Sequence, residues 1–267
     1  MISELAIVDP SAEIGSDVVI GPWSHIGPGV VIGSNTVIGS HVIISGPTRI
    51  GAHNQIDSFC NIGGDPQHLE YHRAKCPLII GNHNVIREYS SIHRGTPDPQ
   101  GIQKTQIGDH NFLMAYSHVA HDCDLGNHII FANNASISGH VSIGDHVVLS
   151  GFVGIHQFCR IGAYAFLGRS AKVVQDIIPF TMVEGNPGAP CGLNRVGLRR
   201  AGFSREQIKV IKDAYRLLFQ EGLSLKAATE ALCELAKGSE DVKILVDFIK
   251  MTRRSLSRPR QRGLATA

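Results

Sequence analysis

Residues 118–144 read HVAHDCDLGNHIIFANNASISGHVSIG, and a hydrophobic residue returns in this stretch at every sixth position. The same spacing runs without a gap from Ile107 to Val173. Small or aliphatic residues mostly stand two places before these positions, and Gly, Asp, Asn or Ser follows, so each hexad predicts a short strand and a corner. Three hexads, or 18 residues, close one triangular coil. The period therefore predicts an all-β parallel β-helix built of hexapeptide repeats.

The period of six starts near the N-terminus, at Val8, and continues to Ile62. It is interrupted at residues 63–79 and again at residues 93–106. Interruptions of a regular repeat are expected to be loops, and long loops are the usual place for function. We therefore expect a β-helix over residues 1–189, with loops at about 63–79 and 93–106.

The hydrophobic period becomes that of amphipathic α-helices in residues 190–267. Ser204 and Gln207 have the spacing of a capping box, which predicts a helix start. The expected helices cover residues 204–219, 224–235 and 240–251. The tail from Arg253 carries five arginines and no acidic residue, and we expect it to be mobile at its end. Residues 190–267 are thus expected to form a small α-helical C-terminal domain with a basic tail.

The cysteine pattern and the N-terminus point to one compartment. The six cysteines include no Cys-x-x-Cys pair, which fits a reducing environment and disfavours a zinc ribbon. The N-terminal stretch MISELAIVDP lacks the basic and apolar regions of a signal peptide, and no apolar run reaches about 18 residues. We expect a cytoplasmic protein with no transmembrane segment.

The charges are unevenly distributed along the chain. Residues 1–189 hold 9 Lys and Arg against 15 Asp and Glu, whereas residues 190–267 hold 16 against 8. The net charges of the two parts are therefore −6 and +8. A basic part beside an acidic one predicts a negatively charged partner for residues 190–267. The sequence carries no helix-turn-helix, zinc-finger or aromatic-basic signature, so we expect no nucleic acid partner.

Residues 18 apart stack in one column of a triangular coil, about 4.8 Å from one another. Several polar residues are brought to one corner by this rule, with His118 on the outer face of the same coil. The three neighbouring columns contain Ala120, Ser138 and His156; His121, Gly139 and Gln157; and Asp122, His140 and Phe158. Four histidines, a carboxylate, a glutamine and a glycine at one corner are a grouping typical of catalysis.

Two kinds of chemistry could use this corner. Three neutral imidazoles can hold a zinc ion, as in zinc-dependent β-helix hydratases. Alternatively, His121 is a general base held by Asp122, and the N–H of Gly139 stabilises an oxyanion. Some of the 14 histidines are expected only to cover a polar face. These surface histidines are His25, His41, His53 and His146.

The motifs HVAHDCDLG, FANNASISGHVSIGD, GIHQFCRIGA, IHRGT and GLNRVGLRRAGFSREQI occur in this order, and the chain resembles the acyl-carrier-protein-dependent UDP-N-acetylglucosamine O-acyltransferases of lipid A biosynthesis. The resemblance covers nearly the whole chain. It implies a left-handed parallel β-helix and a homotrimer with active sites between subunits. It also implies transfer of a 3-hydroxyacyl group from acyl carrier protein to the 3-hydroxyl of the UDP-sugar, with no metal or organic cofactor.

The resemblance implies roles for individual residues. His121 matches the general base, Asp122 lies beside it, and Gly139 matches the backbone donor for the oxyanion. The implied substrate-binding residues are Gln67, His68, His93, His118, His140, His156, Gln157, Asn194 and Arg200. The basic residues expected to dock the acidic carrier protein are Arg199, Arg200, Arg205, Lys212 and Arg216.

Two departures from the family pattern affect specificity. The first loop has His68 and Glu70 where the family commonly has Asp and Lys, which leaves open a 3-amino UDP-sugar and an amide product. Arg169 occupies the position of the acyl-chain ruler, commonly Gly in long-chain members, and Phe166 lies near it in the sequence. We therefore expect a shorter acyl group than the Gly-bearing enzymes accept.

Three further alternatives stay open at this point. They are a related glucosamine N-acyltransferase or acetyl-CoA-dependent acyltransferase, a zinc-dependent β-helix hydratase, and a β-helix scaffold without activity. The early start of the hexads disfavours the N-acyltransferases, which carry an extra N-terminal domain. A scaffold would have no need for the converging histidines.

Overall fold

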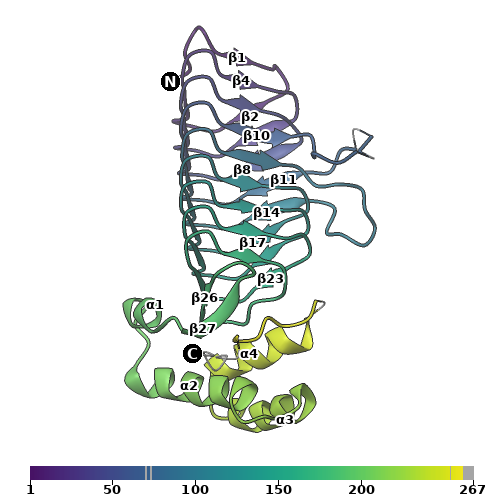
Figure 1. Cartoon of the computed structure of the whole chain (residues 1–267). Coiled ribbons are helices and arrows are strands. Elements are labelled where there is room, and N and C mark those ends of the chain that lie inside the picture. Colours follow the sequence, from purple (N-terminus) through teal and green to yellow (C-terminus); the bar gives the residue numbers. More distant parts are fainter. Residues whose placement is uncertain (70, 73, 253, 261–267) are drawn as a thin grey trace, which may run out of the picture.

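The computed structural model describes residues 1–69, 71–72, 74–252 and 254–260. These residues form a triangular prism of short parallel strands, and a group of helices lies at its C-terminal end (Figure 1). Within the described residues the strands make three sheets, of nine, eight and ten strands. Successive strands of the chain lie on successive faces of the prism, so the chain winds as the hexapeptide period predicts. The expected parallel β-helix is confirmed.

The bounds of the strands follow the hexads. Sheet 1 contains β1 (Ile7–Val8), β4 (His25–Ile26), β7 (Ile43–Ile44), β10 (Asn61–Gly64), β13 (Ser91–His93), β16 (His118–Val119), β19 (Ser136–Ile137), β22 (Gly154–Ile155) and β25 (Lys172–Val173). Sheet 2 contains β2 (Glu13–Ile14), β5 (Val30–Ile32), β8 (Thr48–Ile50), β11 (Leu78–Ile80), β14 (Thr105–Ile107), β17 (Asp124–Leu125), β20 (Ser142–Ile143) and β23 (Arg160–Ile161). Sheet 3 contains β3 (Val19–Ile20), β6 (Val37–Ile38), β9 (Gln55–Ile56), β12 (Val85–Ile86), β15 (Phe112–Leu113), β18 (Ile130–Phe131), β21 (Val148–Leu149), β24 (Phe166–Leu167), β26 (Thr181–Glu184) and β27 (Ala189–Leu193).

The core of the prism is made by the hydrophobic residues that define the period. Ile26, Val119 and Phe131 are each fully buried, as are most of their equivalents in other coils. The residue before each of them in the strand points outward, so each short strand buries one side chain and exposes the next. Aliphatic side chains therefore fill the interior, and the outer faces are free to carry polar groups.

Buried asparagines join successive coils at one corner. The Asn54 Oδ1 accepts hydrogen bonds from the backbone N–H and the Nδ2 of Asn84, at 2.8 and 3.0 Å. The Asn84 Oδ1 accepts from the N–H of Asn111 at 2.9 Å, and the Asn111 Oδ1 accepts from the N–H of Ile129 at 2.7 Å. All three side chains are at most 1% exposed. This ladder satisfies backbone donors that the corner would otherwise leave buried and unpaired.

Exposed histidines stack on the outside of the same edge. His53, His83, His110, His128 and His146 form a column with neighbouring ring centroids 4.7 to 5.0 Å apart and nearly parallel planes. Each of them has a positive φ, near 56 to 59°, which the corner requires. The column ends on Tyr164. His53 and His146, expected from the sequence to be surface residues, belong to this column.

Two loops leave the prism on the same side (Figure 1). The register between neighbouring coils is 18 residues along most of the prism, but it is 30 and 27 residues where the loops occur. The strand bounds place the loops at residues 65–77 and 94–104. Arg94 of the second loop is nearly buried and donates hydrogen bonds to Asp65 of the first loop and to the carbonyl oxygen of Gly46. The two loops are therefore held together at their base.

The C-terminal helices begin after an antiparallel strand pair. β27 pairs antiparallel with β26, so the boundary expected at residues 189 and 190 falls inside the last sheet. The helices are α1 (Arg195–Arg200), α2 (Arg205–Phe219), α3 (Leu225–Ala236) and α4 (Glu240–Lys250). Ser204 and Gln207 form the capping box of α2. The short α1 was not predicted, since six residues are too few to display a helical period.

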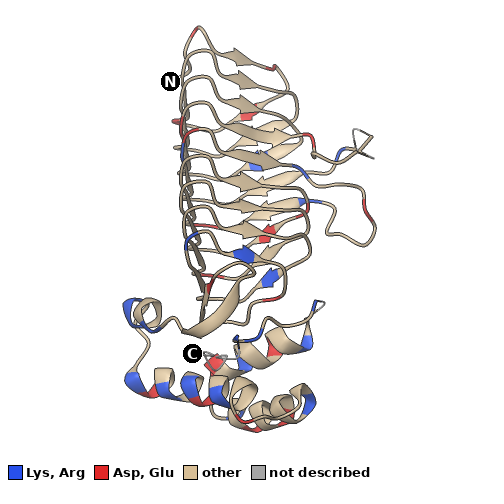
Figure 2. Ribbon diagram, in the orientation of Figure 1, with Lys and Arg blue, Asp and Glu red and all other residues tan. Residues whose placement is uncertain are grey.

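Charge follows the division between prism and helices. Lys and Arg gather on the C-terminal helices, whereas the prism carries more scattered charges of both signs (Figure 2). Among the described residues, no helix is long and apolar enough to cross a membrane.

The asparagine ladder makes a testable contribution to stability. Asn84→Ala leaves the N–H of Asn111 and the Oδ1 of Asn54 without their partner, and unpaired buried groups cost about 1–3 kcal/mol each. We expect urea denaturation at fixed protein concentration to give an apparent free energy of unfolding lower by at least about 2 kcal/mol. Asn133→Ala, at an exposed corner, is the control and should change it by less than about 0.5 kcal/mol. Equal effects of the two substitutions would contradict the role of the ladder.

Candidate active site

The predicted catalytic residues lie together at one corner of the prism. His118 is on β16, His121 and Asp122 follow at the corner before β17, and Gly139 and His140 occupy the same corner one coil further on. The backbone joins the two coils, because the N–H of His140 donates to the carbonyl oxygen of His121 at 3.0 Å. The 18-residue register thus brings these side chains together.

Asp122 orients the imidazole of His121. The Nδ1 of His121 lies 2.9 Å from the Oδ2 of Asp122, whose side chain is completely buried. The same carboxylate accepts hydrogen bonds from the Oγ1 and the backbone N–H of Thr96, at 2.6 and 3.0 Å. Burial alone would raise the pKa of Asp122, but the hydrogen bonds from His121 and Thr96 outweigh it and the pKa is lowered. Asp122 is therefore an anion that leaves the Nε2 of His121 available to a substrate.

Thr96 was not identified from the sequence as part of the site. It lies in the second loop, where no repeat predicts which residues face the prism. The buried Asp122 requires hydrogen-bond donors, and this requirement could have prompted a search of the IHRGT motif for one.

Gly139 provides a buried backbone donor beside His121. Gly139 is buried, and no described residue accepts a hydrogen bond from its N–H. A Cβ added to Gly139 would lie 2.7 and 2.8 Å from the Cε1 and Nε2 of His121, closer than real Cβ atoms approach. The position thus requires glycine, and its N–H lies next to the imidazole that the mechanism needs.

His140 lies on the other side of Asp122. Its Nε2 is 4.0 Å from Asp122 and 3.9 Å from Asp98 of the second loop, and its ring stacks on Phe158 with centroids 4.5 Å apart. Burial lowers the pKa of His140, against the opposing effect of Asp122. Ligand atoms of His121, Asp122 and His140 lie within 4.8 Å of one another, a spacing that could hold a metal ion. The expectation of no metal stays a prediction, since the Nδ1 of His121 is already bonded to Asp122.

Most of the predicted substrate-binding residues line one cavity of about 310 Å³. The residues that line it include Gln67, His68, His93, His118, His121, Gly139 and Gln157. His68 of the first loop meets His121 edge to face, with ring centroids 5.6 Å apart. The substitution of His68 noted in the sequence thus lies directly at the imidazole, whereas Glu70 lies outside the described residues. His156 is on the rim, beside Gln157.

The histidines at the base of this cavity are neutral. His118 is bonded to the Oγ of Ser91 at 2.8 Å, and His93 to the carbonyl oxygen of Asp65 at 2.6 Å. Burial, with a smaller effect from His93, lowers the pKa of His118 to about 4. Burial also lowers the pKa of His93. At neutral pH both therefore offer hydrogen bonds rather than positive charge.

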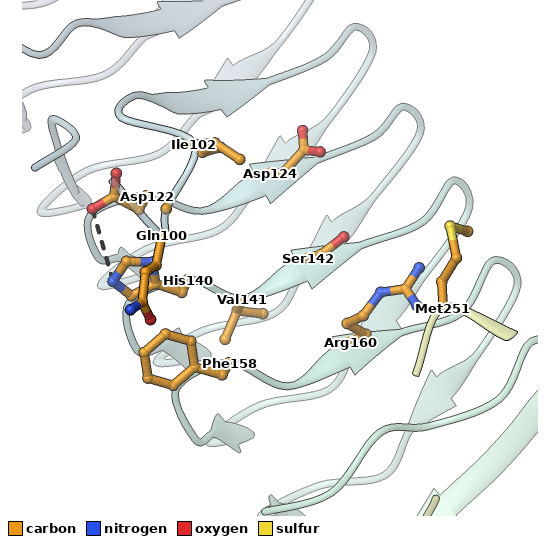
Figure 3. Close-up of a pocket in the computed structure, with 11 residues that line it drawn as sticks. Gln100, Ile102, Asp122, Asp124, His140, Val141, Ser142, Phe158, Arg160 and Met251 are labelled. Carbon is orange, nitrogen blue, oxygen red and sulfur yellow. Dashed lines mark ion pairs between the residues drawn. The ribbon is translucent and has the colours of Figure 1, made fainter. Parts of the chain in front are cut away.

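A second cavity, of about 400 Å³, lies on the far side of His140. Figure 3 shows that Asp122 and His140 separate it from the corner, and that Asp124, Ser142 and Arg160 follow one another along the outer face of sheet 2. Gln100 and Ile102 of the second loop and Met251 complete its wall. The sequence analysis missed this cavity, although Asp124, Ser142 and Arg160 are 18 residues apart and form a predictable column.

Four predicted residues lie away from the histidine cavity. Asn194 caps α1, where its side chain accepts from the N–H of Gly197 and donates to the carbonyl oxygen of Tyr164. Arg200 lies in the last turn of α1. Arg169 and Phe166 lie near the end of the prism, where the guanidinium of Arg169 is 5.7 Å from the ring centroid of Phe152. None of the four lines the cavity of His121 within one chain.

The predicted docking residues divide into two groups. Arg199, Arg205 and Lys212 line a basic cavity of about 590 Å³ between α1 and α2. Its other wall residues include two further cations, Arg195 and Lys209. Arg200 does not line it, and Arg216 is paired with Glu221 at 3.0 Å.

The fold and the corner together define a class. A histidine held by a buried carboxylate, on a β-helix of hexapeptide repeats, is typical of the hexapeptide-repeat acyltransferases. The profile of bacterial transferase hexapeptides matches residues 11–46 and 104–139, and the profile of UDP N-acetylglucosamine O-acyltransferase, domain 2, matches residues 176–257.

Relatives and solved structures identify the family within this class. The chain is 54% identical over 253 residues to the acyl-[acyl-carrier-protein]–UDP-N-acetylglucosamine O-acyltransferase of Halorhodospira halophila, covering 95% of this chain and 97% of that protein. It is 53% identical to the enzyme of Alkalilimnicola ehrlichii, with the same coverage. The structure of the Francisella novicida UDP-N-acetylglucosamine acyltransferase matches with a TM-score of 0.94 at 41% identity, over 97% of this chain and 94% of that one. The structure from Moraxella catarrhalis gives 0.94 at 43%, over 96% and 99%.

The chain belongs to the family of acyl-[acyl-carrier-protein]–UDP-N-acetylglucosamine O-acyltransferases. The resemblance found in its motifs is confirmed. These relatives give no support to a zinc-dependent hydratase or to a 3-amino acceptor.

The low pKa of His118 predicts a pH dependence of stability. Its pKa is about 4 in the folded chain and near 6.5 when unfolded, so unfolding takes up a proton between these values and stability falls as the pH decreases from about 6.5 to 4. His118→Gln should reduce this slope, by up to about 1 kcal/mol per pH unit. Urea denaturation at pH 7, 6 and 5 measures it. His25→Gln, at an exposed position, should leave the slope unchanged, and an equal slope in His118→Gln would disprove the assignment.

Proposed function

We propose that this protein transfers a 3-hydroxyacyl group from acyl carrier protein to the 3-hydroxyl of UDP-N-acetylglucosamine, the first step of lipid A biosynthesis. The observation that carries this proposal is the pairing of His121 with the buried Asp122, next to the unpaired N–H of Gly139. The names of the relatives supply the donor and the acceptor. In a cell the reaction would take place in the cytoplasm.

His121 acts as the general base in this proposal. Its Nε2 removes the proton of the sugar hydroxyl while the hydroxyl oxygen attacks the thioester carbonyl carbon. The N–H of Gly139 stabilises the oxyanion of the tetrahedral intermediate. The C–S bond then breaks, and the carrier thiolate takes the proton from His121. Asp122 remains ionised throughout and stabilises the imidazolium, since its hydrogen bonds favour the anion.

The neutral histidines bind the sugar rather than attract its charge. His93, His118 and His140 have lowered pKa values, so each can both donate and accept hydrogen bonds with hydroxyl and amide groups. Gln67, His68, His156 and Gln157 surround the same space and are proposed to complete the binding of the UDP-sugar and the pantetheine arm. The reaction needs no metal or organic cofactor, because the thioester supplies the free energy of transfer.

The proposed protein is a homotrimer. Asn194 and Arg200 do not line the cavity of their own chain, and in a trimer a neighbouring subunit could bring them to the nucleotide. The fork of donors on Arg200 suits a phosphate group. Exposed aliphatic side chains on the prism, such as Val19, Val37 and Ile43, are consistent with contacts between subunits.

The acyl chain and the carrier protein are proposed to bind at separate places. Arg169 and Phe166 limit the length of the acyl groove, and the contact of Arg169 with Phe152 holds the guanidinium over the ring. The basic cavity of Arg199, Arg205 and Lys212 receives the acidic carrier protein, together with Arg200 and Arg216.

The proposed reaction is tested by acyl transfer from a series of 3-hydroxyacyl carrier proteins to UDP-N-acetylglucosamine. We expect transfer by the wild type and a loss of about 10²–10⁴-fold in kcat/KM for His121→Ala, the usual contribution of a general base. His25→Ala, on the outer face of the same sheet, is the control. If the folded wild type does not transfer to this sugar, the proposal fails; the 3-amino sugar and metal analysis are then the next measurements.

The ruler is tested by removing the side chain of Arg169. Arg169→Gly should move the maximum of kcat/KM to a longer 3-hydroxyacyl chain, because the groove is then no longer closed by the guanidinium. The same donor series on both proteins measures the shift. An unchanged preference would mean that another residue sets the chain length.

The docking surface is tested by charge reversal. Arg205→Glu should raise KM for the carrier protein about tenfold and weaken its dependence on salt, with KM for the sugar nucleotide unchanged. Lys237→Glu, an exposed cation outside the basic cavity, serves as the control. Equal KM values for Arg205→Glu and the wild type would place docking elsewhere.

A further inference from the structure

The described part of the C-terminal tail packs back onto the end of the prism. Leu256 pairs with Asp176 in a parallel bridge, the N–H of Asp176 donates to the carbonyl oxygen of Ser255 at 3.2 Å, and the N–H of Ser257 donates to that of Asp176 at 2.9 Å. Leu256 is 8% exposed and Ser257 3%. Residues 254–260 are therefore attached to the fold, and the expectation of mobility does not apply to them. Residues 253 and 261–267 lie outside the described residues.

This attachment places Arg254 at the active site. Its Nη1 lies 2.6 Å from the carbonyl oxygen of Gln157 and 2.9 Å from the Nδ1 of His156, residues that are 97 and 98 positions away in the sequence. Gln157 lines the cavity that contains His121. The guanidinium thus reaches the rim of the cavity from the opposite end of the chain.

The contact fixes the protonation of His156. A guanidinium has only donors, so the Nδ1 of His156 must accept the hydrogen bond, and the proton of the neutral ring must be on Nε2. Arg254 therefore turns His156 into a donor at Nε2. The backbone of Gln157 is held by the same group.

The charge of Arg254 lacks a carboxylate partner. Within the ranges that the structure describes, Arg254 forms no salt bridge, and both of its acceptors are neutral. The side chain is partly exposed at the rim, so an anion can reach it. Arginine is suited to phosphate, because its parallel N–H groups match two phosphate oxygens.

We propose that Arg254 is a substrate-binding residue, which binds a phosphate group at the rim of the cavity and holds His156 and Gln157 in position. This inference rests on the proposed function, whose two substrates both carry phosphate: the diphosphate of the sugar nucleotide and the phosphopantetheine of the carrier protein. The shared chemistry is a phosphate ester or anhydride, and the kinetics of the two substrates distinguish the sources.

The test compares Arg254→Gln and Arg254→Lys with the wild type in the full chain. A charge-assisted hydrogen bond contributes about 1.5–3 kcal/mol, so we expect Arg254→Gln to raise one KM by about ten- to hundredfold. Arg254→Lys should show a smaller increase, since it keeps the charge and loses the fork. Arg258→Gln, an exposed arginine of the same tail, is the control and should leave both constants unchanged.

The substrate whose KM rises identifies the phosphate. An increase for UDP-N-acetylglucosamine alone assigns Arg254 to the nucleotide diphosphate, and an increase for the carrier protein alone assigns it to phosphopantetheine. If neither KM changes by more than twofold in Arg254→Gln, the proposal is overturned.

A second measurement is independent of turnover. The ring nitrogens of ¹⁵N-labelled His156 should show an unprotonated Nδ1 and a protonated Nε2 in the wild type, and a mixture of tautomers in Arg254→Gln. Calorimetric binding of UDP to both proteins accompanies it. An inactive wild type would refute the proposed function, while an unchanged His156 spectrum in Arg254→Gln would refute the contact itself.

Discussion

The hydrogen bonds between successive coils are the constraint on which the site depends. Each coil donates its backbone N–H groups to carbonyl oxygens 18 residues along, as the bond from His140 to His121 illustrates. A residue can therefore change its neighbours only if the register changes. Because Gly139 follows His121 by one register, a buried N–H lies beside the imidazole without any loop having to place it there.

The parts of the site that obey the register could be predicted from the sequence. Counting by 18 placed Gly139 against His121 and Phe158 against His140, and both pairs are in contact. Thr96 and Arg254 could not be predicted, because they lie in segments with no period to count. Their positions depend on tertiary contacts, with the buried Asp122 for the loop and with Asp176 for the tail.

The protein separates two electrostatic tasks. Around His121 the only buried anion is neutralised by donors, and the nearby histidines are uncharged at neutral pH because of burial, so the chemistry has a site with little net charge. The cations gather instead on the C-terminal helices (Figure 2). Attraction of acidic or phosphorylated molecules and proton transfer are thus carried out by different parts of the fold, with Arg254 at the border between them.

The two wide coils, with registers of 30 and 27 residues, have a consequence for how such proteins change over evolution. A deletion or insertion of one hexad within the regular wall would carry every later residue onto the next face of the prism and scatter the catalytic columns. A loop that returns to the same corner avoids this, since the coils above and below keep their alignment. Variation in length is thereby confined to excursions such as residues 65–77 and 94–104, which carry His68, Thr96 and Asp98 to the imidazoles. New specificity can be acquired there while the inherited catalytic machinery stays in place.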